Sequence, residues 1–342
     1  MKEMRCLRQC AEALFVRGEV HNLAVRVGYG KEVVAELIQG SDRRMLDADT
    51  LFDMASVTKV MATTALALIA IDRGLLSPAD KVSRFFSVPE DKRELSVYHL
   101  LTHTMGIGYK ALYKSEISYD CVAEHILHIP SDIPIGSDVK YSCPGFILLG
   151  KIVEKVLGDR LDRLFRDLVA MPLGMERSGF LPEKTLHIVN ANKTEAETGL
   201  VNDMNCRSLG GVAGNAGLFS TLNDVTRFAR MMLDLGSPLI SEKTFSSAIQ
   251  NRTSCMSEGR GLGFLCVEDR YQQTGGLFPE GSFGHCGHTG QSVFVHHESG
   301  LYVVILSDAT ASMIQKYGRE NYDGVKQMRH DLHAAIAKDL AL

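Results

Sequence analysis

The pattern of hydrophobic and polar residues divides the chain into two ends with strand patterns and a middle with helical ones. Near the start, helical periodicity covers residues 2–17, and two strand-like runs follow at residues 22–28 and 32–38. The turn Tyr29-Gly30-Lys31 separates these runs and predicts a β-hairpin. Towards the end, further strands are predicted at residues 263–268, 291–296 and 301–307, and a last helix at 321–338.

The middle of the chain, from Ser56 to about Leu235, has the pattern of helices joined by loops, with examples at residues 146–156, 161–169 and 222–235. Strand-rich ends around a helical middle are typical of an α+β architecture in which both ends pair into one antiparallel sheet covered by the terminal helices. We therefore predict a sheet lobe from residues 1–54 and 256–342, a mainly helical lobe from residues 55–255, and a cleft between them.

One apolar helical run begins directly after a serine and a lysine three positions apart, at Ser56-Val57-Thr58-Lys59. Positions i and i+3 share one face of a helix, so the Lys59 amine can reach the Ser56 oxygen and help to remove its proton. We expect this helix to be buried and to stop at Gly74. Ser56 would then lie at its N-terminal end, where the helix dipole favours an anion.

The same spacing recurs at Ser137-Asp138-Val139-Lys140. There, Tyr141 and Pro144 follow without a clean helical run, so no helix is expected to bring the serine and the lysine onto one face. The spacing alone is therefore weak support, and the apolar run after the first match carries the prediction.

The composition is that of a globular protein and excludes some classes of function. The chain has 342 residues, of which 45% are hydrophobic and 23% charged, and its net charge of −4 gives no reason to expect a nucleic-acid partner. We find no apolar run long enough to span a bilayer and no apolar signal core in residues 1–10. These features predict a cytoplasmic protein without a membrane partner.

No metal and no cofactor is expected. The eight cysteines include no C-x-x-C pair, so neither a zinc site nor a disulfide framework is indicated. His296-His297-Glu298 are adjacent on a predicted strand, where neighbours point to opposite faces and cannot easily share a metal. Gly28-Tyr29-Gly30 lacks the third glycine of a dinucleotide fingerprint, and no Walker loop occurs. His99 and His103 are expected to support the helical lobe.

Two further motifs follow the Ser56–Lys59 pair. They are Lys140-Tyr141-Ser142-Cys143-Pro144-Gly145 and Phe283-Gly284-His285-Cys286-Gly287-His288-Thr289-Gly290. The three motifs resemble the S-x-x-K helix, the Tyr-x-Asn loop and the K-T-G or H-T-G strand of the serine β-lactamase and penicillin-binding-protein superfamily. The stretches 99–107, 209–220 and 261–264 are similar to its branch of class C-like enzymes and small esterases. The resemblance covers nearly the whole chain and implies one catalytic domain with a β-lactamase/transpeptidase-like fold.

The resemblance implies a role for each matching residue. Ser56 would be the nucleophile, and Lys59 would be neutral or share a proton because burial and nearby cations lower its pKa. Tyr141 would be the partner base, since a phenolate beside Lys59 and His285 becomes accessible near neutral pH. The alternatives are structural: Ser56 as a helix N-cap, Lys59 as a surface lysine and Tyr141 as a packed aromatic residue.

Two overlapping triplets compete for the place of the third motif, His285-Cys286-Gly287 and the literal His288-Thr289-Gly290. The family's fuller pattern resembles G-H-T-G-x-T-G with the first triplet facing the site, and we take the His285 register. His285 would orient a substrate carboxylate or join the proton network of Lys59 and Tyr141, unless it is only structural.

The resemblance also implies an oxyanion hole made by the backbone N–H groups of Ser56 and His288, with Gly287 and Cys143 beside the substrate. Each such donor typically contributes about 3 kcal/mol to transition-state stabilisation. Since the donor is backbone, the His288 side chain need not take part.

Departures from the family pattern bear on the substrate. Cys143 stands where penicillin-recognising enzymes place Asn, His285 where most β-lactamases carry Lys, and Cys286 where they carry Thr. Cysteine is a weak hydrogen-bond partner, so recognition of a carboxylated amide is weakened. We therefore predict a serine hydrolase that acts on small esters through an acyl-enzyme. The alternatives are a β-lactamase or D-Ala-D-Ala carboxypeptidase, and a non-catalytic binding module on a hydrolase scaffold.

Overall fold

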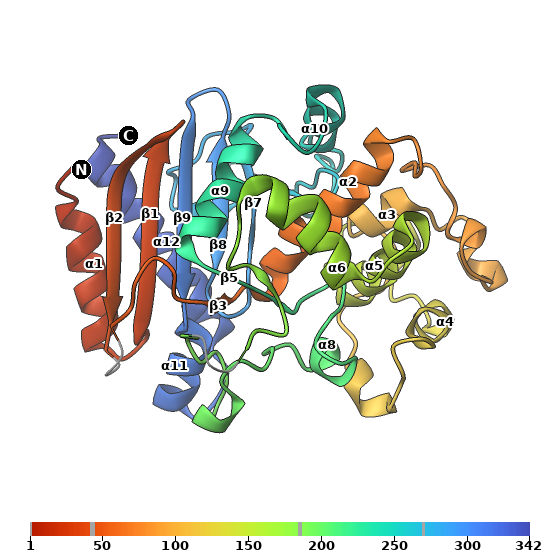
Figure 1. The fold of residues 1–342 in the computed structure, drawn as a ribbon, viewed down its shortest axis with the longest axis horizontal. Coiled ribbons are helices and arrows are strands. Elements are labelled where there is room, and N and C mark those ends of the chain that lie inside the picture. The colour runs from red at the N-terminus through yellow and green to blue at the C-terminus, as the bar shows by residue number, and fades with distance from the viewer. Residues whose placement is uncertain (1, 42–44, 184–186, 269–270) are drawn as a thin grey trace.

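The computed structural model describes residues 2–41, 45–183, 187–268 and 271–342. Its main sheet is antiparallel, with the strand order β2-β1-β9-β8-β7-β6 (Figure 1). The strands are β1 (Asn22–Tyr29), β2 (Glu32–Gly40), β6 (Leu265–Cys266), β7 (Phe283–Cys286), β8 (Ser292–His296) and β9 (Leu301–Ser307). Because β1 pairs with β9, the two ends of the chain meet inside one sheet, which confirms the predicted α+β architecture.

The hairpin of β1 and β2 lies where the sequence predicted it, and its side chains reach both faces of the sheet. Leu23, Val25 and Val27 belong to the apolar cluster under the terminal helices. Ala24 belongs to the cluster on the opposite face, where the Arg26 guanidinium donates to a threonine of α9 (Leu222–Leu233). Successive side chains of a strand point to opposite faces, so one strand serves two cores.

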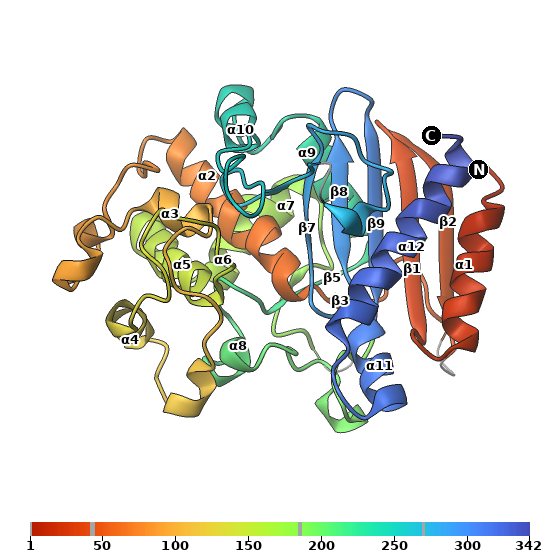
Figure 2. The ribbon, with the colours of Figure 1, turned by 180° about the vertical axis from the view of Figure 1, so that it is seen from behind.

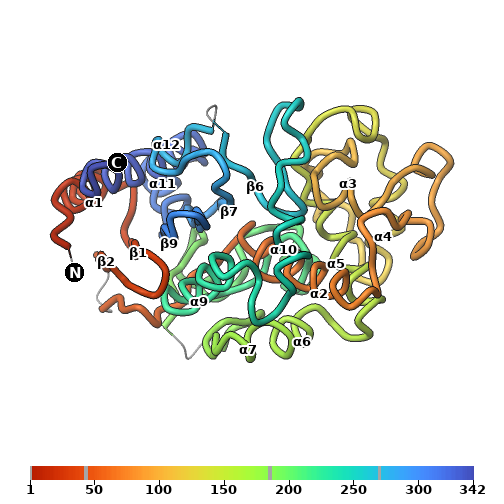
Figure 3. Tube along the Cα trace, turned by 90° about the horizontal axis from the view of Figure 1, so that it is seen from above, coloured from red at the N-terminus to blue at the C-terminus, as the bar shows by residue number. Residues whose placement is uncertain are grey.

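The terminal helices α1 (Arg5–Val16) and α12 (Tyr322–Leu340) lie side by side over one face of the sheet (Figure 2). The Asp339 carboxylate near the end of α12 accepts from the backbone N–H groups of Cys6 and Leu7, at 3.0 and 2.9 Å. Helix α9 covers the opposite face (Figure 3). The sheet is therefore buried on both sides.

The rest of the chain is mainly helical. Its helices are α2 (Ala65–Asp72), α3 (Val97–Leu101), α4 (Val122–His128), α5 (Cys143–Leu157), α6 (Leu161–Phe165), α7 (Met171–Leu173), α8 (Met204–Ser208), α9 and α10 (Glu242–Ala248), and α11 (Ala309–Tyr317) precedes α12. A small sheet that the sequence did not predict, in the order β3-β5-β4, consists of β3 (Phe52–Asp53), β5 (Leu218–Ser220) and β4 (Gly179–Phe180). The predicted lobe boundaries at residues 54/55 and 255/256 stay predictions.

The apolar run after Ser56 forms one continuous helix, Ala55–Asp72. It starts with the 3-10 turn η1 (Ala55–Val57), continues through the π-helical segment η2 (Lys59–Thr64) and ends as α2. By length and composition it is apolar enough to cross a bilayer, so the expectation that no run reaches that length was wrong. Its side chains are used inside the protein, since 83% of the helix is buried.

One predicted strand is much shorter than expected. The pattern predicted a strand over residues 263–268, but β6 contains only Leu265 and Cys266. Gly263 has φ +84°, outside the strand region, and a Cβ there would lie 2.0 Å from the Thr64 hydroxyl oxygen. The close approach to the Ser56 helix ends the strand.

Candidate active site

Ser56 and Lys59 lie together at the start of the apolar helix. Ser56 belongs to the 3-10 turn η1 and Lys59 begins the π-helical segment η2, so the two residues share one face of the helix, and the Lys59 Nζ donates to Ser56 Oγ at 3.0 Å. The Lys59 side chain is fully buried, whereas Ser56 is half-buried. Nζ also donates to the carbonyl of Asn215 at 3.0 Å and to the sulfur of Cys143 at 3.6 Å. Three contacts therefore fix the amine beside the serine.

The turn before Ser56 has an unusual backbone. Ala55 has φ +44°, a left-handed conformation that is uncommon for residues with a Cβ. The buried Asp53 carboxylate accepts from the Ala55 N–H at 2.8 Å and supports this conformation. Burial raises the pKa of Asp53 to about 6, although two backbone N–H donors act to lower it. Since the Asp53 carbonyl accepts from Thr289 and Gln291, the turn is also tied to the segment after β7.

Tyr141 lies two residues before α5, with its ring centroid 4.9 Å from Lys59 Nζ. Burial raises the pKa of Tyr141 to about 12, even though the charge of Lys59 and hydrogen bonds with Lys59 and Ser56 act to lower it. The structure thus brings the three predicted groups together. The expectation of a phenolate near neutral pH was wrong, because desolvation outweighs the nearby positive charge.

The expected lowering of the Lys59 pKa was also wrong. Burial acts to lower this pKa, but interactions with Cys143, Tyr141 and Asp203 act in the opposite direction, and the net effect raises it. The raised pKa favours the ammonium form of Lys59, which donates to Ser56 Oγ.

Cys143 is the first residue of α5 and is buried beside Lys59. Burial raises the pKa of the Cys143 thiol, while Lys59 acts to lower it. The helix start is held by Ser142, whose side chain accepts from the Gly145 N–H at 3.0 Å. A neutral thiol thus occupies the position where the resembling family has an amide side chain.

The two candidate histidines of the third motif lie in different surroundings. His285 is buried on β7, with its ring centroid 6.2 Å from that of Tyr141. The His288 ring follows the strand and stacks on Tyr322 at 5.5 Å, with Nε2 3.9 Å from Glu320. Proximity to Tyr141 therefore favours the His285 register, while the catalytic role itself stays a prediction.

His285 is neutral, which limits what it can do. Burial lowers its pKa well below the ordinary range, and the charges of Arg260 and Lys59 add to this effect. Its Nδ1 lies 2.8 Å from the Cys286 carbonyl, which can only accept, so Nδ1 carries the proton and Nε2 is an acceptor. A neutral acceptor cannot bind a carboxylate, and the predicted carboxylate-orienting role is not supported. A role in the proton network remains open to it.

Gly287 brings the end of β7 next to the Ser56 turn. A Cβ at this position would lie 2.8 Å from the Met54 carbonyl oxygen and 3.4 Å from the Ala55 Cβ, so only glycine allows this approach. The backbone of His288 follows immediately. This contact supports, without testing it directly, the prediction that the backbone N–H groups of Ser56 and His288 form the oxyanion hole.

Sequence reasoning missed two residues beside Tyr141. Arg260 is buried, with its guanidinium carbon 5.6 Å from the Tyr141 ring centroid, and pairs with Glu258. His103 was expected only to support the helical lobe, but its ring lies 4.6 Å from the Tyr141 ring, and its Nδ1 accepts from the Ser142 N–H at 3.0 Å. His103 lies inside the family stretch at residues 99–107, and Arg260 directly precedes the stretch at residues 261–264.

The two cavities that the structure describes lie away from the Ser56–Lys59 pair. No group of three or more metal-ligating side chains occurs in the described part of the chain. One cavity of about 460 Å³ lies between α1 and α12, and another of about 260 Å³ lies beside α2 and α10. Neither cavity is lined by Ser56. Ser56, Tyr141 and His288 are each partly exposed at the surface.

The chain resembles known proteins along most of its length. A family model described as Beta-lactamase matches residues 7–322. Penicillin-binding protein 4 of Amycolatopsis lactamdurans is 31% identical over 252 residues, which are 70% of this chain and 62% of that protein. The "Putative D-alanyl-D-alanine carboxypeptidase" of Escherichia coli O157:H7 is 28% identical over 307 residues, which are 78% of this chain and 70% of that protein. The chain thus spans less than two thirds of the first relative.

A solved structure has the same fold. EstCE1, described as a hydrolase with promiscuous acyltransferase activity, superimposes with a TM-score of 0.76 at 21% identity. The match covers 95% of this chain and 98% of EstCE1. The likeness therefore extends over the whole β-lactamase/transpeptidase-like fold.

Proposed function

Because the chain belongs to the β-lactamase family of serine hydrolases related to penicillin-binding proteins, we propose that it hydrolyses small esters through an acyl-enzyme on Ser56. The observation that carries the proposal is the 3.0 Å hydrogen bond from Lys59 Nζ to Ser56 Oγ inside a buried helix. The Cys143 sulfur and the Asn215 carbonyl already accept from Lys59 Nζ. The buried amine therefore does not depend on Ser56 for its hydrogen bonds.

The proposed reaction has two steps. Ser56 Oγ attacks the ester carbonyl carbon, its proton passes to the Lys59–Tyr141 pair, and the pair returns that proton to the alcohol oxygen as the C–O bond breaks. The negative oxygen formed on attack is held by the backbone N–H groups of Ser56 and His288. Water then attacks the acyl carbon and gives its proton to the same pair, and the acid leaves as Ser56 regains a proton.

The protonation of the site makes the rate of the proposed reaction depend on pH. The pKa values of both Lys59 and Tyr141 are raised, so the pair keeps its protons at neutral pH. The form that can accept the Ser56 proton is gained as pH rises and lost as pH falls. Acylation is therefore expected to become faster towards alkaline pH.

Two residues favour esters over amides. The Cys143 thiol is neutral and already accepts from Lys59, so it offers little to the amide group of a β-lactam or peptide. The neutral His285 offers no charge to a substrate carboxylate. An ester needs neither contact, and its alcohol is a better leaving group than an amine.

The second candidate is amide hydrolysis, as a β-lactamase or D-Ala-D-Ala carboxypeptidase. The names of the relatives from Amycolatopsis and Escherichia favour it. A third candidate is a binding module without turnover, which the intact contacts among Ser56, Lys59 and Tyr141 argue against.

A labelling experiment with a substrate panel tests these candidates. Wild-type protein should react once with a fluorophosphonate, seen by intact mass, and Ser56→Ala should not react. No labelling of the wild type at any pH would favour the binding module. With p-nitrophenyl butyrate, nitrocefin and a D-Ala-D-Ala peptide, the ester should have the highest kcat/KM. Cys143→Asn should raise the nitrocefin-to-ester ratio about tenfold, the effect of one good hydrogen bond.

A further inference from the structure

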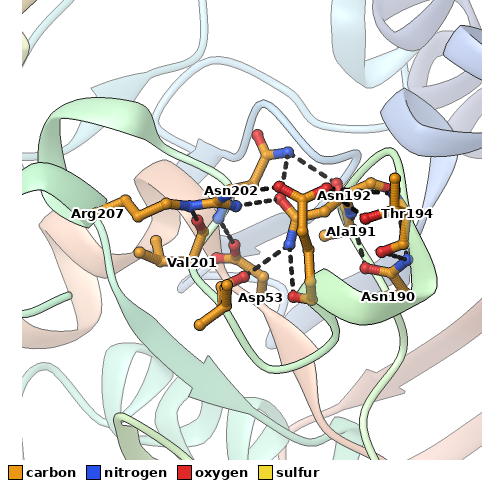
Figure 4. A network of polar contacts seen from close by, with 10 residues as sticks. Asp53, Asn190, Ala191, Asn192, Thr194, Val201, Asn202 and Arg207 are labelled. Carbon is orange, nitrogen blue, oxygen red and sulfur yellow. Dashed lines mark hydrogen bonds and ion pairs between the residues drawn. The ribbon is translucent and has the colours of Figure 1, made fainter. Parts of the chain in front are cut away.

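Asn202 and Asp203 contact both sides of the Ser56–Lys59 pair. The Asn202 N–H donates to the Asp53 carboxylate at 2.6 Å, and the other oxygen of that carboxylate holds the Ala55 N–H before Ser56 (Figure 4). On the other side, the Asp203 carboxylate accepts from the Asn215 side chain at 3.0 Å. The Asn215 carbonyl in turn accepts from Lys59 Nζ. Two neighbouring residues thus support the serine through one route and the lysine through another.

These two residues belong to a segment, residues 190–207, that is stiffened by its own polar contacts. Arg207 donates to the side chains of Asn192 and Glu197 at 2.6 and 2.7 Å, and to the Val201 carbonyl at 2.8 Å. The Asn202 side chain donates to the Ala191 carbonyl at 2.7 Å (Figure 4). These internal contacts order the segment without help from the site. It can therefore hold Asp53 and Asn215 in place.

Asp203 also contributes charge. The ionisable groups facing Lys59 are Tyr141 and Cys143 at the start of α5, Asp203 and Cys206 at α8, His103 after α3 and His285 on β7. Burial raises the pKa of Tyr141, Cys143 and Cys206 and lowers the pKa of both histidines, so these five are neutral at neutral pH. Within this group of six, the Asp203 carboxylate is the negative charge that favours the Lys59 ammonium.

We propose that Asp203 is a positioning residue for the reaction: it holds Lys59 in place through Asn215 and sets the protonation of Lys59 through its charge. The inference rests on the proposed serine acylation. It assigns the 190–207 segment the task of supporting the nucleophile and the amine together, through Asp53 and Asn215.

Two variants separate the charge from the contact. Asp203→Asn keeps an oxygen that accepts from Asn215 and caps α8, but it removes the negative charge. The Lys59 ammonium then loses a stabilising partner, so the rate of fluorophosphonate labelling at pH 8 should rise about three- to tenfold. Asn215→Ala keeps the backbone carbonyl but releases it from Asp203, and labelling should fall about tenfold.

The proposal predicts faster labelling for Asp203→Asn and slower labelling for Asn215→Ala, and this difference in sign makes the test decisive. A purely structural role for Asp203 predicts slower labelling in both variants, so unchanged or slower labelling of Asp203→Asn overturns the proposal. Unchanged labelling of Asn215→Ala overturns it as well. The matched control is Glu320→Gln, which removes a carboxylate near His288 that has no contact with Asn215. An equal acceleration in this variant would mean a general charge effect and would also overturn the proposal. Thermal melting confirms that each variant is folded.

A second measurement does not depend on catalysis. In protein carrying [6-13C]lysine, the Lys59 resonance is assigned by its absence in Lys59→Arg. In Asp203→Asn this resonance should begin to titrate at a pH about half a unit to one unit lower than in the wild type. A wild type that never labels refutes the proposed function, whereas an unmoved Lys59 titration refutes the role of Asp203.

Discussion

Two segments of this chain share the S-x-x-K spacing, but they differ in every physical respect that matters for chemistry. Lys59 is fully buried, with its Nζ 3.0 Å from Ser56 Oγ at the start of a helix. Lys140 has a side chain that is 40% exposed and lies 3.7 Å from Asp132. Ser137 is exposed and donates to a nearby backbone carbonyl, and residues 136–141 contain no helical turn.

The comparison shows that the S-x-x-K spacing brings the serine and lysine side chains together only where the two residues lie on a helix. The helix places positions i and i+3 on one face, and its buried continuation fixes the lysine stem. In the loop, the same two residue types are free to pair with other partners. The paired segments therefore provide internal controls for mutation.

The largest effect is expected from the serines. Ser56→Ala removes the proposed nucleophile and should lower kcat/KM for p-nitrophenyl butyrate by about 10⁴-fold or more, whereas Ser137→Ala should change it by less than about twofold. Initial rates for both variants check this. Turnover that survives in Ser56→Ala would contradict the proposal that Ser56, unlike Ser137, is the nucleophile.

The lysines should give the next largest effect. Lys59→Ala removes the proton carrier of the proposed reaction and should lower kcat/KM by about 10³-fold, within the range of general acid–base catalysis. Lys140→Ala loses one exposed ion pair and should stay within about threefold of the wild type. Similar losses in both variants would mean that Lys59 acts only through stability, which melting curves would reveal.

The two His-x-Gly triplets extend the comparison to β7. His285→Ala should lower kcat/KM by about 10- to 100-fold, because its ring lies beside Tyr141 in the buried network. His288→Ala should lower it by less than about threefold, since the proposed oxyanion donor there is backbone. The reverse ranking would shift the motif to the literal H-T-G triplet.

The smallest effect concerns pH. Because the pKa values of Lys59 and Tyr141 are raised, the competent form is gained with rising pH, and labelling should accelerate up to about tenfold per pH unit above neutrality. Lys140→Ala should keep this slope. The pKa of His285 lies well below its ordinary range, so no titration near pH 6.5 is expected from it. A bell centred near neutral pH would contradict these assignments.

Local patterns predicted the parts of the fold that depend on local interactions. The strand over residues 301–307 was found with the predicted bounds, and the Ser56–Lys59 pair could be predicted because both residues belong to one helix. The three-stranded sheet of β3, β5 and β4 was not predicted, since its strands are two or three residues long and β3 pairs with β5 across more than a hundred positions.

The protonation of the site could not be predicted from the sequence. Whether the Lys59 pKa falls or rises depends on which groups folding brings to it, and Asp203 and Cys143 come from segments far along the chain. The same holds for Arg260, because no periodic pattern in the sequence predicts that it lies beside Tyr141. Residue types indicated the chemistry, but the balance of charges is a property of the folded protein.

The helix that carries Ser56 and Lys59 is also the most buried helix of its lobe, whereas Cys143 and His285 come from two other elements. Under the proposed function, a change of substrate class therefore does not require any change in Ser56 or Lys59. Substitutions at Cys143 and His285 can change which acyl group is accepted. Packing constrains the helix, so the proposed chemistry of Ser56 and Lys59 is kept while those positions vary.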